Sequence, residues 1–75
     1  MMFDIGRVCM KIAGRDAGNL CVVVENNGQF VVVDGYTRRR KVSIKHLEPL
    51  NYAVKVPSGA DAKALQQLVD EVTTN

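Results

Sequence analysis

Four cations stand side by side in the sequence, at Arg38, Arg39, Arg40 and Lys41. Alternate residues of an extended strand lie about 7 Å apart, within a Debye length of about 8 Å at physiological salt, so these like charges repel one another. Phosphate groups relieve the repulsion and release counterions. Arginine also grips phosphate with a planar fork and stacks on bases, so three arginines favour a nucleic acid over an acidic protein. Most charge runs are solvated turns, so the run taken alone is a weak signal.

Further cations precede and follow this run. Arg7 and Lys11 share one parity of a predicted strand, Lys41 and Lys45 share one parity of another, and Arg15 lies in the loop GRDAGN. If the two strands lie on the same side of the fold, the cations form one stripe that neutralises phosphates. The residues predicted to bind a nucleic acid are Arg7, Lys11, Arg15, Arg38, Arg39, Arg40, Lys41 and Lys45.

The charge is unevenly distributed along the chain. Residues 1–55 carry nine Lys/Arg and five Asp/Glu, a net charge of +4, whereas residues 56–75 carry one Lys and three Asp/Glu, a net charge of −2. The first part is thus more basic than the total of +2 suggests, which points to a polyanion as a partner.

Other chemistry finds little support. His46 is the single histidine and shares parity with Val42 and Ile44, which favours a structural role. With no second histidine and no CxxC spacing, we expect no metal and no cofactor. Cys9 has the parity opposite to the predicted core set of its strand, which disfavours a Cys–His nucleophile, so Cys9 and Cys21 are interpreted as packing residues.

An enzyme is also disfavoured by size. A chain of 75 residues has room for one core, and a deep cleft would remove part of it. The loop GRDAGN lacks the GxxxxGK[ST] pattern and precedes a predicted strand, so no nucleotide or other small-molecule substrate is expected. No catalytic residue is predicted.

Hydrophobic patterning predicts the elements. Residues 5–13 alternate as a half-buried strand, with Gly6, Val8, Met10 and Ile12 facing the core and Arg7 and Lys11 facing outward on either side of Cys9. Strands follow over 20–25 and 29–34, joined by the hairpin dipeptide Asn27-Gly28. That loop places Val22 opposite Val33 and Val24 opposite Val31, with Val23, Phe30 and Val32 on the other face. Both faces are apolar and must be covered, by curling of the sheet or by a helix.

The remaining elements are a strand over 41–46 that Pro49 stops, a short strand over 51–56 and a helix over about 60–72. Ser58 and Asp61 resemble a capping box, and the apolar residues of the helix repeat at helical spacing. Five strands, tight turns and one helix predict a mainly β fold, a small SH3-like antiparallel barrel with one C-terminal helix. Residues 1–75 form a single domain, with the barrel at 1–56 and the helical tail at 57–75. No secretory or transmembrane segment is apparent, so no membrane association is expected, and the cytosol is the predicted compartment.

Two stretches carry a family resemblance. Residues 6–24, GRVCMKIAGRDAGNLCVVV, resemble a KOW motif around Gly18, and the matching positions are Gly14, Arg15, Asp16 and Gly18. Residues 38–50, RRRKVSIKHLEPL, resemble the signature that follows in the large-subunit ribosomal protein family L-fourteen-e of archaea and eukaryotes. Its matching positions are Arg38 to Lys41 and then His46, Leu47, Glu48 and Pro49, of which His46 and Pro49 are interpreted as structural.

The resemblance implies an SH3-like barrel of the archaeal form, with ribosomal RNA and neighbouring large-subunit ribosomal proteins as partners. It implies a cytoplasmic location on the ribosome, no catalysis and no cofactor. Off the ribosome we expect a monomer.

A second hypothesis is a KOW protein–protein interaction module of a transcription or translation factor. It depends on the possible apolar face of Val23, Phe30 and Val32, which would mark an interface if nothing covered it. The position of the C-terminal helix distinguishes the two hypotheses.

Overall fold

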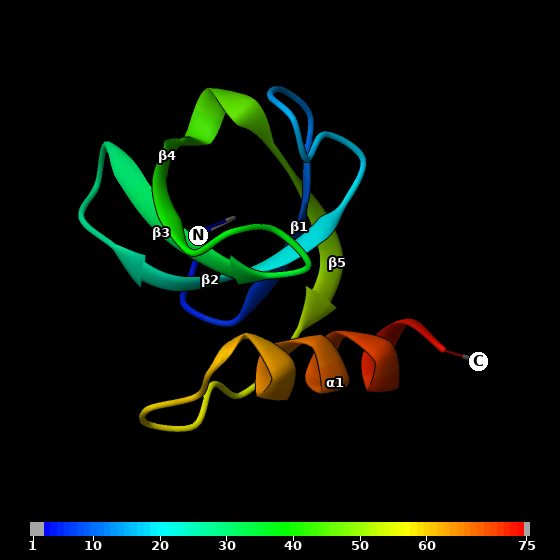
Figure 1. Cartoon of the computed structure of the whole chain (residues 1–75). Coiled ribbons are helices and arrows are strands. Elements are labelled where there is room, and N and C mark those ends of the chain that lie inside the picture. The colour runs from blue at the N-terminus through cyan, green and yellow to red at the C-terminus, as the bar shows by residue number, and fades with distance from the viewer. Residues whose placement is uncertain (1–2, 75) are drawn as a thin grey trace.

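One curved antiparallel sheet holds all the strands of the computed structural model, which describes residues 3–74 (Figure 1). The elements are β1 (Arg7–Lys11), β2 (Leu20–Asn26), β3 (Phe30–Gly35), β4 (Arg40–Ser43), the 3-10 helix η1 (Ile44–His46), β5 (Leu47–Ala53) and α1 (Ala62–Thr73). The strand order is β4-β3-β2-β1-β5. The short helix η1 carries the chain from one edge strand to the other.

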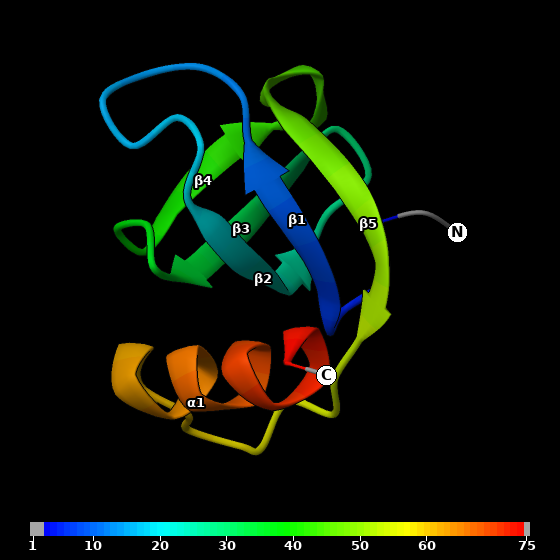
Figure 2. The same cartoon turned by 90° about the vertical axis from the view of Figure 1, so that its right-hand side faces the viewer.

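The predicted fold class is confirmed. The protein is mainly β, with one C-terminal helix, and the sheet curls into a barrel-like, SH3-like form (Figure 2). The curl does not close, because β4 and β5 are the two edges and do not pair with each other in the described sheet. Within residues 3–74 no helix has the length and apolar character needed to cross a membrane.

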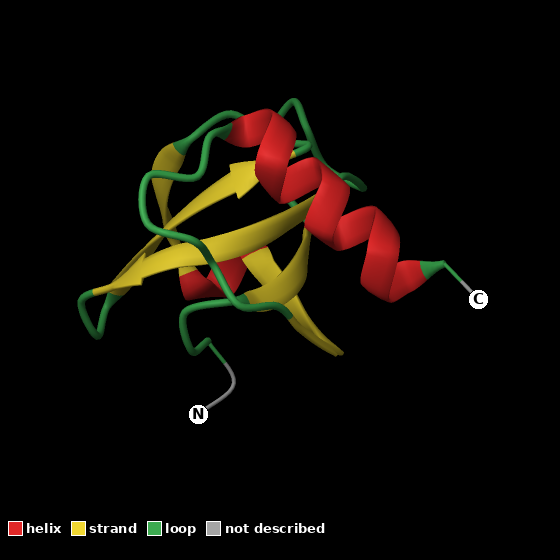
Figure 3. Ribbon diagram, turned by 90° about the horizontal axis from the view of Figure 1, so that it is seen from below, coloured by secondary structure: helices red, strands yellow, loops and turns green. Residues whose placement is uncertain are grey.

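The central hairpin is covered on both faces, as its apolar residues predict. The inside of the curl holds the inner cluster, which consists of Cys9, Cys21, Val23, Val31, Val33, Val42 and Leu47. The outside is covered by α1, which lies across the sheet (Figure 3) and forms the helix cluster of Val8, Val22, Leu65 and Val69. Complete burial of each such side chain stabilises the fold by roughly 1.5–3 kcal/mol.

The helix begins close to its predicted start, but with a different cap. Asp61 is the N-cap, and its Oδ1 accepts a hydrogen bond from Ala64 N at 2.9 Å, so the prediction of a capping box at Ser58 is wrong. Residues 57–60 instead form a turn, in which Ala60 N donates to Pro57 O at 3.2 Å. An aspartate at the cap satisfies a free helix N–H and complements the helix dipole.

The predicted hairpin register is wrong. Asn27 N donates to Phe30 O at 3.1 Å, so the two-residue loop is Gly28-Gln29. A bulge between Val23 and Glu25 then shifts the register, with Val23 opposite Val33 and Val22 opposite Asp34. As a result Val22 faces the helix while Val23 faces the inner cluster.

The predicted faces of β1 also need correction. Val8 and Cys9 are both fully buried, Lys11 is buried and Ile12 is 52% exposed. Since β1 is flanked by two strands and covered on both faces, parity does not separate buried from exposed side chains. Arg7 and Lys11 therefore do not stand on an outer face with Cys9 between them.

The end of the sheet departs from prediction as well. The strand predicted over 41–46 ends at Ser43, and the last strand runs over residues 47–53 rather than 51–56. Pro49 does not stop a strand but lies within β5, opposite Cys9. An edge strand tolerates proline because one side of its backbone has no partner to bond.

Candidate nucleic-acid interface

The loop between β1 and β2 is fastened to the connection between β3 and β4. Asp16 Oδ1 accepts a hydrogen bond from Lys11 Nζ at 2.7 Å, and Asp16 Oδ2 accepts one from Arg38 N at 3.4 Å. The hydrogen bond from Lys11 is the main cause that lowers the pKa of the Asp16 carboxyl below its ordinary value. Asn19 Nδ2 donates to Tyr36 O at 3.2 Å and adds a second link. These contacts bring Arg15 and Arg38, distant in sequence, to one surface.

Three arginines line one hollow of about 250 Å³, here called the arginine hollow. Its lining residues are Arg15, Asp16, Asn19, Tyr36, Arg38 and Arg40. Within residues 3–74 the guanidinium groups of the three arginines make no hydrogen bond or ion pair, and all three side chains are exposed. Their charge is therefore available to an anion.

A second hollow of about 380 Å³, here called the Phe30 hollow, shares Arg40 with the first. Its lining residues include Lys11, Gly14, Phe30, Arg40, Lys41 and His46. Lys41 Nζ lies 4.8 Å from the centre of the Phe30 ring, a cation–π contact that holds this charge at the rim. Arg40 therefore borders both hollows.

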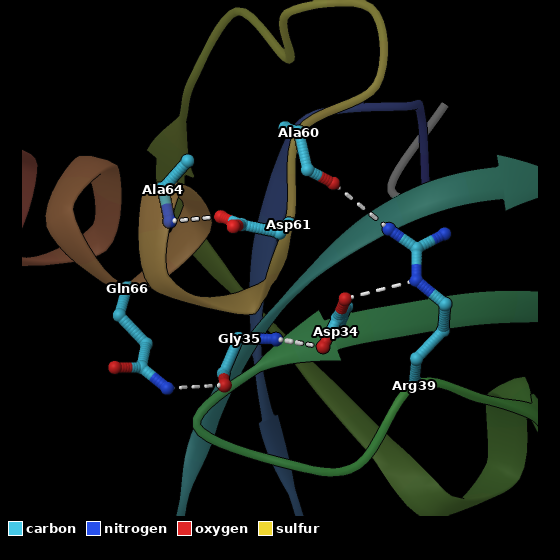
Figure 4. Close-up of polar contacts among 7 residues, drawn as sticks. All are labelled: Asp34, Gly35, Arg39, Ala60, Asp61, Ala64 and Gln66. Carbon is cyan, nitrogen blue, oxygen red and sulfur yellow. Dashed lines mark hydrogen bonds and ion pairs between the residues drawn. The ribbon is translucent and has the colours of Figure 1, made fainter.

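Arg39 is the exception in the cation run. Its Nε donates to Asp34 Oδ2 at 2.9 Å and its Nη2 donates to Ala60 O at 3.1 Å (Figure 4). Asp34 is buried and also accepts a hydrogen bond from Gly35 N at 2.8 Å. Arg39 therefore fastens the turn before β4 to the segment before α1.

Two other predicted RNA-binding residues are also engaged inside the protein. Lys11 is paired with Asp16 and is 4% exposed. Arg7 is half-buried, its Nη1 donates to Leu50 O at 3.1 Å, and its Nε is buried without a hydrogen-bond partner. Arg7 and Lys11 thus make contacts within the protein itself.

The other predicted site residues lie near this surface or in the sheet. Lys45 is exposed in η1, and Gly18 N donates to Lys11 O at 2.7 Å within the KOW loop. The His46 side chain is exposed, while its carbonyl accepts a hydrogen bond from Ile12 N at 2.9 Å. The backbone of His46 thus links η1 to the end of β1.

Asn19 was not considered as a site residue from the sequence, which left open whether Tyr36 stacks on a base or lies at the edge of the core. Tyr36 directly precedes Thr37 and the cation run, and Asn19 ends the GRDAGN loop. Proximity in sequence was the available signal, but it does not show that Asn19 and Tyr36 meet, because this contact depends on the pairing of β2 with β3.

The two cysteines are packing residues. Cys9 and Cys21 lie opposite each other on β1 and β2, and both are free thiols. Burial raises the pKa of Cys9 to about 11 and that of Cys21 to about 12, so neither is a nucleophile at neutral pH. The described residues contain no group of three or more His, Cys, Asp or Glu side chains that would hold a metal ion.

The fold and this surface define a small SH3-like β module with a basic rim and a C-terminal helix. No protein-family model matches the chain. It is 41% identical over 68 residues to large ribosomal subunit protein eL14 of Methanococcus vannielii, covering 89% of this chain and 88% of the relative. It is 42% identical over 74 residues to the eL14 of Desulfurococcus amylolyticus (91% and 77%) and 36% identical over 76 residues to that of Metallosphaera sedula (93% and 79%). The chain belongs to the eL14 family of archaeal large ribosomal subunit proteins.

Proposed function

We propose that this protein is a structural constituent of the large ribosomal subunit and binds ribosomal RNA through the two basic hollows. The observation that carries the proposal is the convergence of Arg15, Arg38 and Arg40 on one hollow, although two separate segments supply them. Its relatives are named as proteins of the large ribosomal subunit.

The electrostatics of the arginine hollow favour a polyanion. Three guanidinium groups share this hollow with one carboxylate, that of Asp16, which is already paired with Lys11. The remaining positive charge is neutralised when phosphates enter and release their counterions. The RNA-contacting set that we propose is narrower than the one predicted from sequence. It consists of Arg15, Arg38, Arg40 and Lys41, which line the two hollows, and of the exposed Lys45, whose neighbour His46 lines the Phe30 hollow.

Arg7, Lys11 and Arg39 act in this proposal as positioning residues. Lys11 holds Asp16, which in turn holds the backbone of Arg38. Arg39 holds the turn that carries the other cations. The protein works as a rigid, non-catalytic component of the cytoplasmic ribosome, next to RNA and neighbouring ribosomal proteins.

The salt dependence of RNA binding tests the proposal. The probe is purified large-subunit ribosomal RNA. The variant carries alanine in place of Arg38, Arg40 and Lys41 together. The slope of log affinity against log salt should become shallower by roughly 0.7–0.9 for each phosphate that the variant no longer neutralises. The matched control is Lys55→Ala, which removes an exposed cation between β5 and α1 and should leave the slope unchanged. A triple variant with the wild-type slope contradicts the proposal.

The second hypothesis, a protein–protein interaction module, depended on an exposed apolar face that the structure does not have within residues 3–74. Val23 is fully buried in the inner cluster, so Val23, Phe30 and Val32 do not form one outer face. The helix covers the opposite face of the sheet, where it packs on Val8 of β1 and Val22 of β2.

A further inference from the structure

Tyr36 is the aromatic residue of the arginine hollow, and hydrogen bonds to its side chain and to its backbone hold it in place. Its hydroxyl donates to Asp70 Oδ1 on α1 at 2.7 Å, and its carbonyl accepts from Asn19 Nδ2 at 3.2 Å. The residue is nevertheless 42% exposed. An exposed ring that is held in place loses little conformational entropy when a ligand stacks on it.

The surroundings of Tyr36 suit a nucleotide more than a bare phosphate. Besides lining the arginine hollow, Tyr36 lines a hollow with Gln66, Gln67 and Asp70 of α1. Arginine side chains suited to phosphates therefore lie beside a planar ring and beside amide groups that donate and accept hydrogen bonds. Phe30 differs, because Lys41 already lies over its ring.

A continuous RNA duplex makes no use of such a ring. Its bases are stacked and paired, so it presents phosphates and 2′-hydroxyls to a protein, whereas loops and bulges present bases that stack on aromatic side chains. We propose that Tyr36 stacks on an unpaired nucleotide of the RNA while Arg15, Arg38 and Arg40 hold the phosphates beside it. This inference depends on the proposed function, and it narrows the ligand from RNA in general to an RNA with an extruded base.

Two RNA probes test the inference. One is a continuous RNA duplex, and the other is the same duplex with a short unpaired bulge. The wild-type protein should bind the bulged duplex roughly tenfold more tightly, since stacking of one base on an aromatic side chain has an effect of this order. Equal affinity for the two probes overturns the inference but not the proposed function. No salt-dependent binding to either probe overturns both.

Variants of Tyr36 identify the ring as the cause. Tyr36→Leu should lower the affinity for the bulged probe to that for the continuous duplex and leave the latter unchanged. Tyr36→Phe keeps the ring, loses only the bond to Asp70 and should retain most of the preference. The matched control is Tyr52→Leu, which removes a ring of similar exposure (37%) from β5, at the opposite edge of the sheet from β4. It should change neither affinity.

A spectroscopic readout keeps the test independent of the stability of Tyr36→Leu. When 2-aminopurine occupies the bulge, its fluorescence should fall on binding the wild-type protein and the Tyr36→Phe variant, because a stacked aromatic ring quenches it. An unchanged fluorescence of the bound probe overturns the inference, and so does a Tyr36→Leu variant that binds both probes as the wild type does.

Discussion

Arg39 Nε lies 2.9 Å from Oδ2 of Asp34, a carboxylate whose side chain is 5% exposed. This pair divides the cation run by function, because one of its four members serves the fold while Arg38, Arg40 and Lys41 face the two hollows. The repulsion expected along the run is thus relieved at one position by the protein's own carboxylate.

Replacement of Arg39 should affect stability more than RNA affinity. Arg39→Ala leaves the buried Asp34 without its cation and leaves Ala60 O without its donor, so we expect a loss of roughly 1–3 kcal/mol in the free energy of unfolding. Urea denaturation measures this loss. Arg38→Ala, whose guanidinium has no partner among the described residues, should stay within about 0.5 kcal/mol of wild type. Equal destabilisation by the two changes would argue against this division.

Gly6 should be far less tolerant of a side chain than Gly28. Both have positive φ, +97° and +99°, so alanine at either position strains the backbone by roughly 1–2 kcal/mol. Only at Gly6 does an added Cβ lie 2.0 Å from Val54 O, whereas nothing lies within 4 Å at Gly28. We expect Gly6→Ala to lower the unfolding free energy by roughly 1–3 kcal/mol more than Gly28→Ala. Comparable thermal midpoints for the two variants would refute this expectation.

The elements of this fold were more predictable than their faces. Turn residues and hydrophobic periods are local signals, so the hairpin, the helix and the curled sheet were found from the sequence. The bulge after Val23 is one residue long and leaves no local mark, yet it reverses which valines face inward. Similarly, the alternating pattern of its strand predicted that Lys11 faces outward. In the structure Lys11 is buried, because Asp16 in the following loop pairs with its ammonium group.

The candidate site was predictable in composition but not in assembly. The sequence indicated a basic surface containing Arg15, Arg38 and Arg40. The internal contacts of Arg39 were not predicted, since they depend on how the β3–β4 connection brings it onto Asp34 and on the fold that places Ala60 O, 21 residues away, within reach. The spacing of residues along the sequence does not show which distant side chains and backbone groups meet in the fold.

Leu65 should anchor the C-terminal helix to the sheet. It is fully buried in the helix cluster beside Val8 and Val22, so Leu65→Ala should lower the unfolding free energy by about 2–5 kcal/mol through reduced burial and a cavity. Leu68→Ala is the control on the same helix. Because Leu68 is only half-buried, this change should lower the unfolding free energy by less than Leu65→Ala does. This role would be contradicted if hydrogen exchange showed that α1 of the Leu65→Ala variant detaches from the sheet while the unfolding free energy stays at the wild-type value.

The thiols should be inert in the folded protein. Both cysteines are fully buried and their pKa values are raised to about 11 and about 12, so the reactive thiolate is scarce at neutral pH and inaccessible. We expect an aromatic disulfide reagent to titrate no thiol in native protein and both thiols once urea has unfolded it. Rapid modification of either cysteine under native conditions would show that β1 and β2 separate readily.

Lys11 should control the pKa of Asp16 and, through it, the acid stability of the loop. The pKa of Asp16 is lowered from 3.8, mainly by the hydrogen bond from Lys11 Nζ. A lowered folded-state pKa means that this pair stabilises the protein fully above the unfolded-state pKa of about 4 and loses its effect as the pH falls through the folded-state pKa.

The test compares wild type with Lys11→Met, which keeps an unbranched side chain but removes the charge. In the variant, carbon NMR should show the pKa of Asp16 shifted back toward 3.8, although Arg38 N still donates to the carboxylate. The difference in unfolding free energy between the two proteins should be largest above about pH 4 and should shrink at lower pH, as Asp16 becomes protonated in both. If the difference instead stays constant across this range, Lys11 stabilises the loop through its packing and not through its charge.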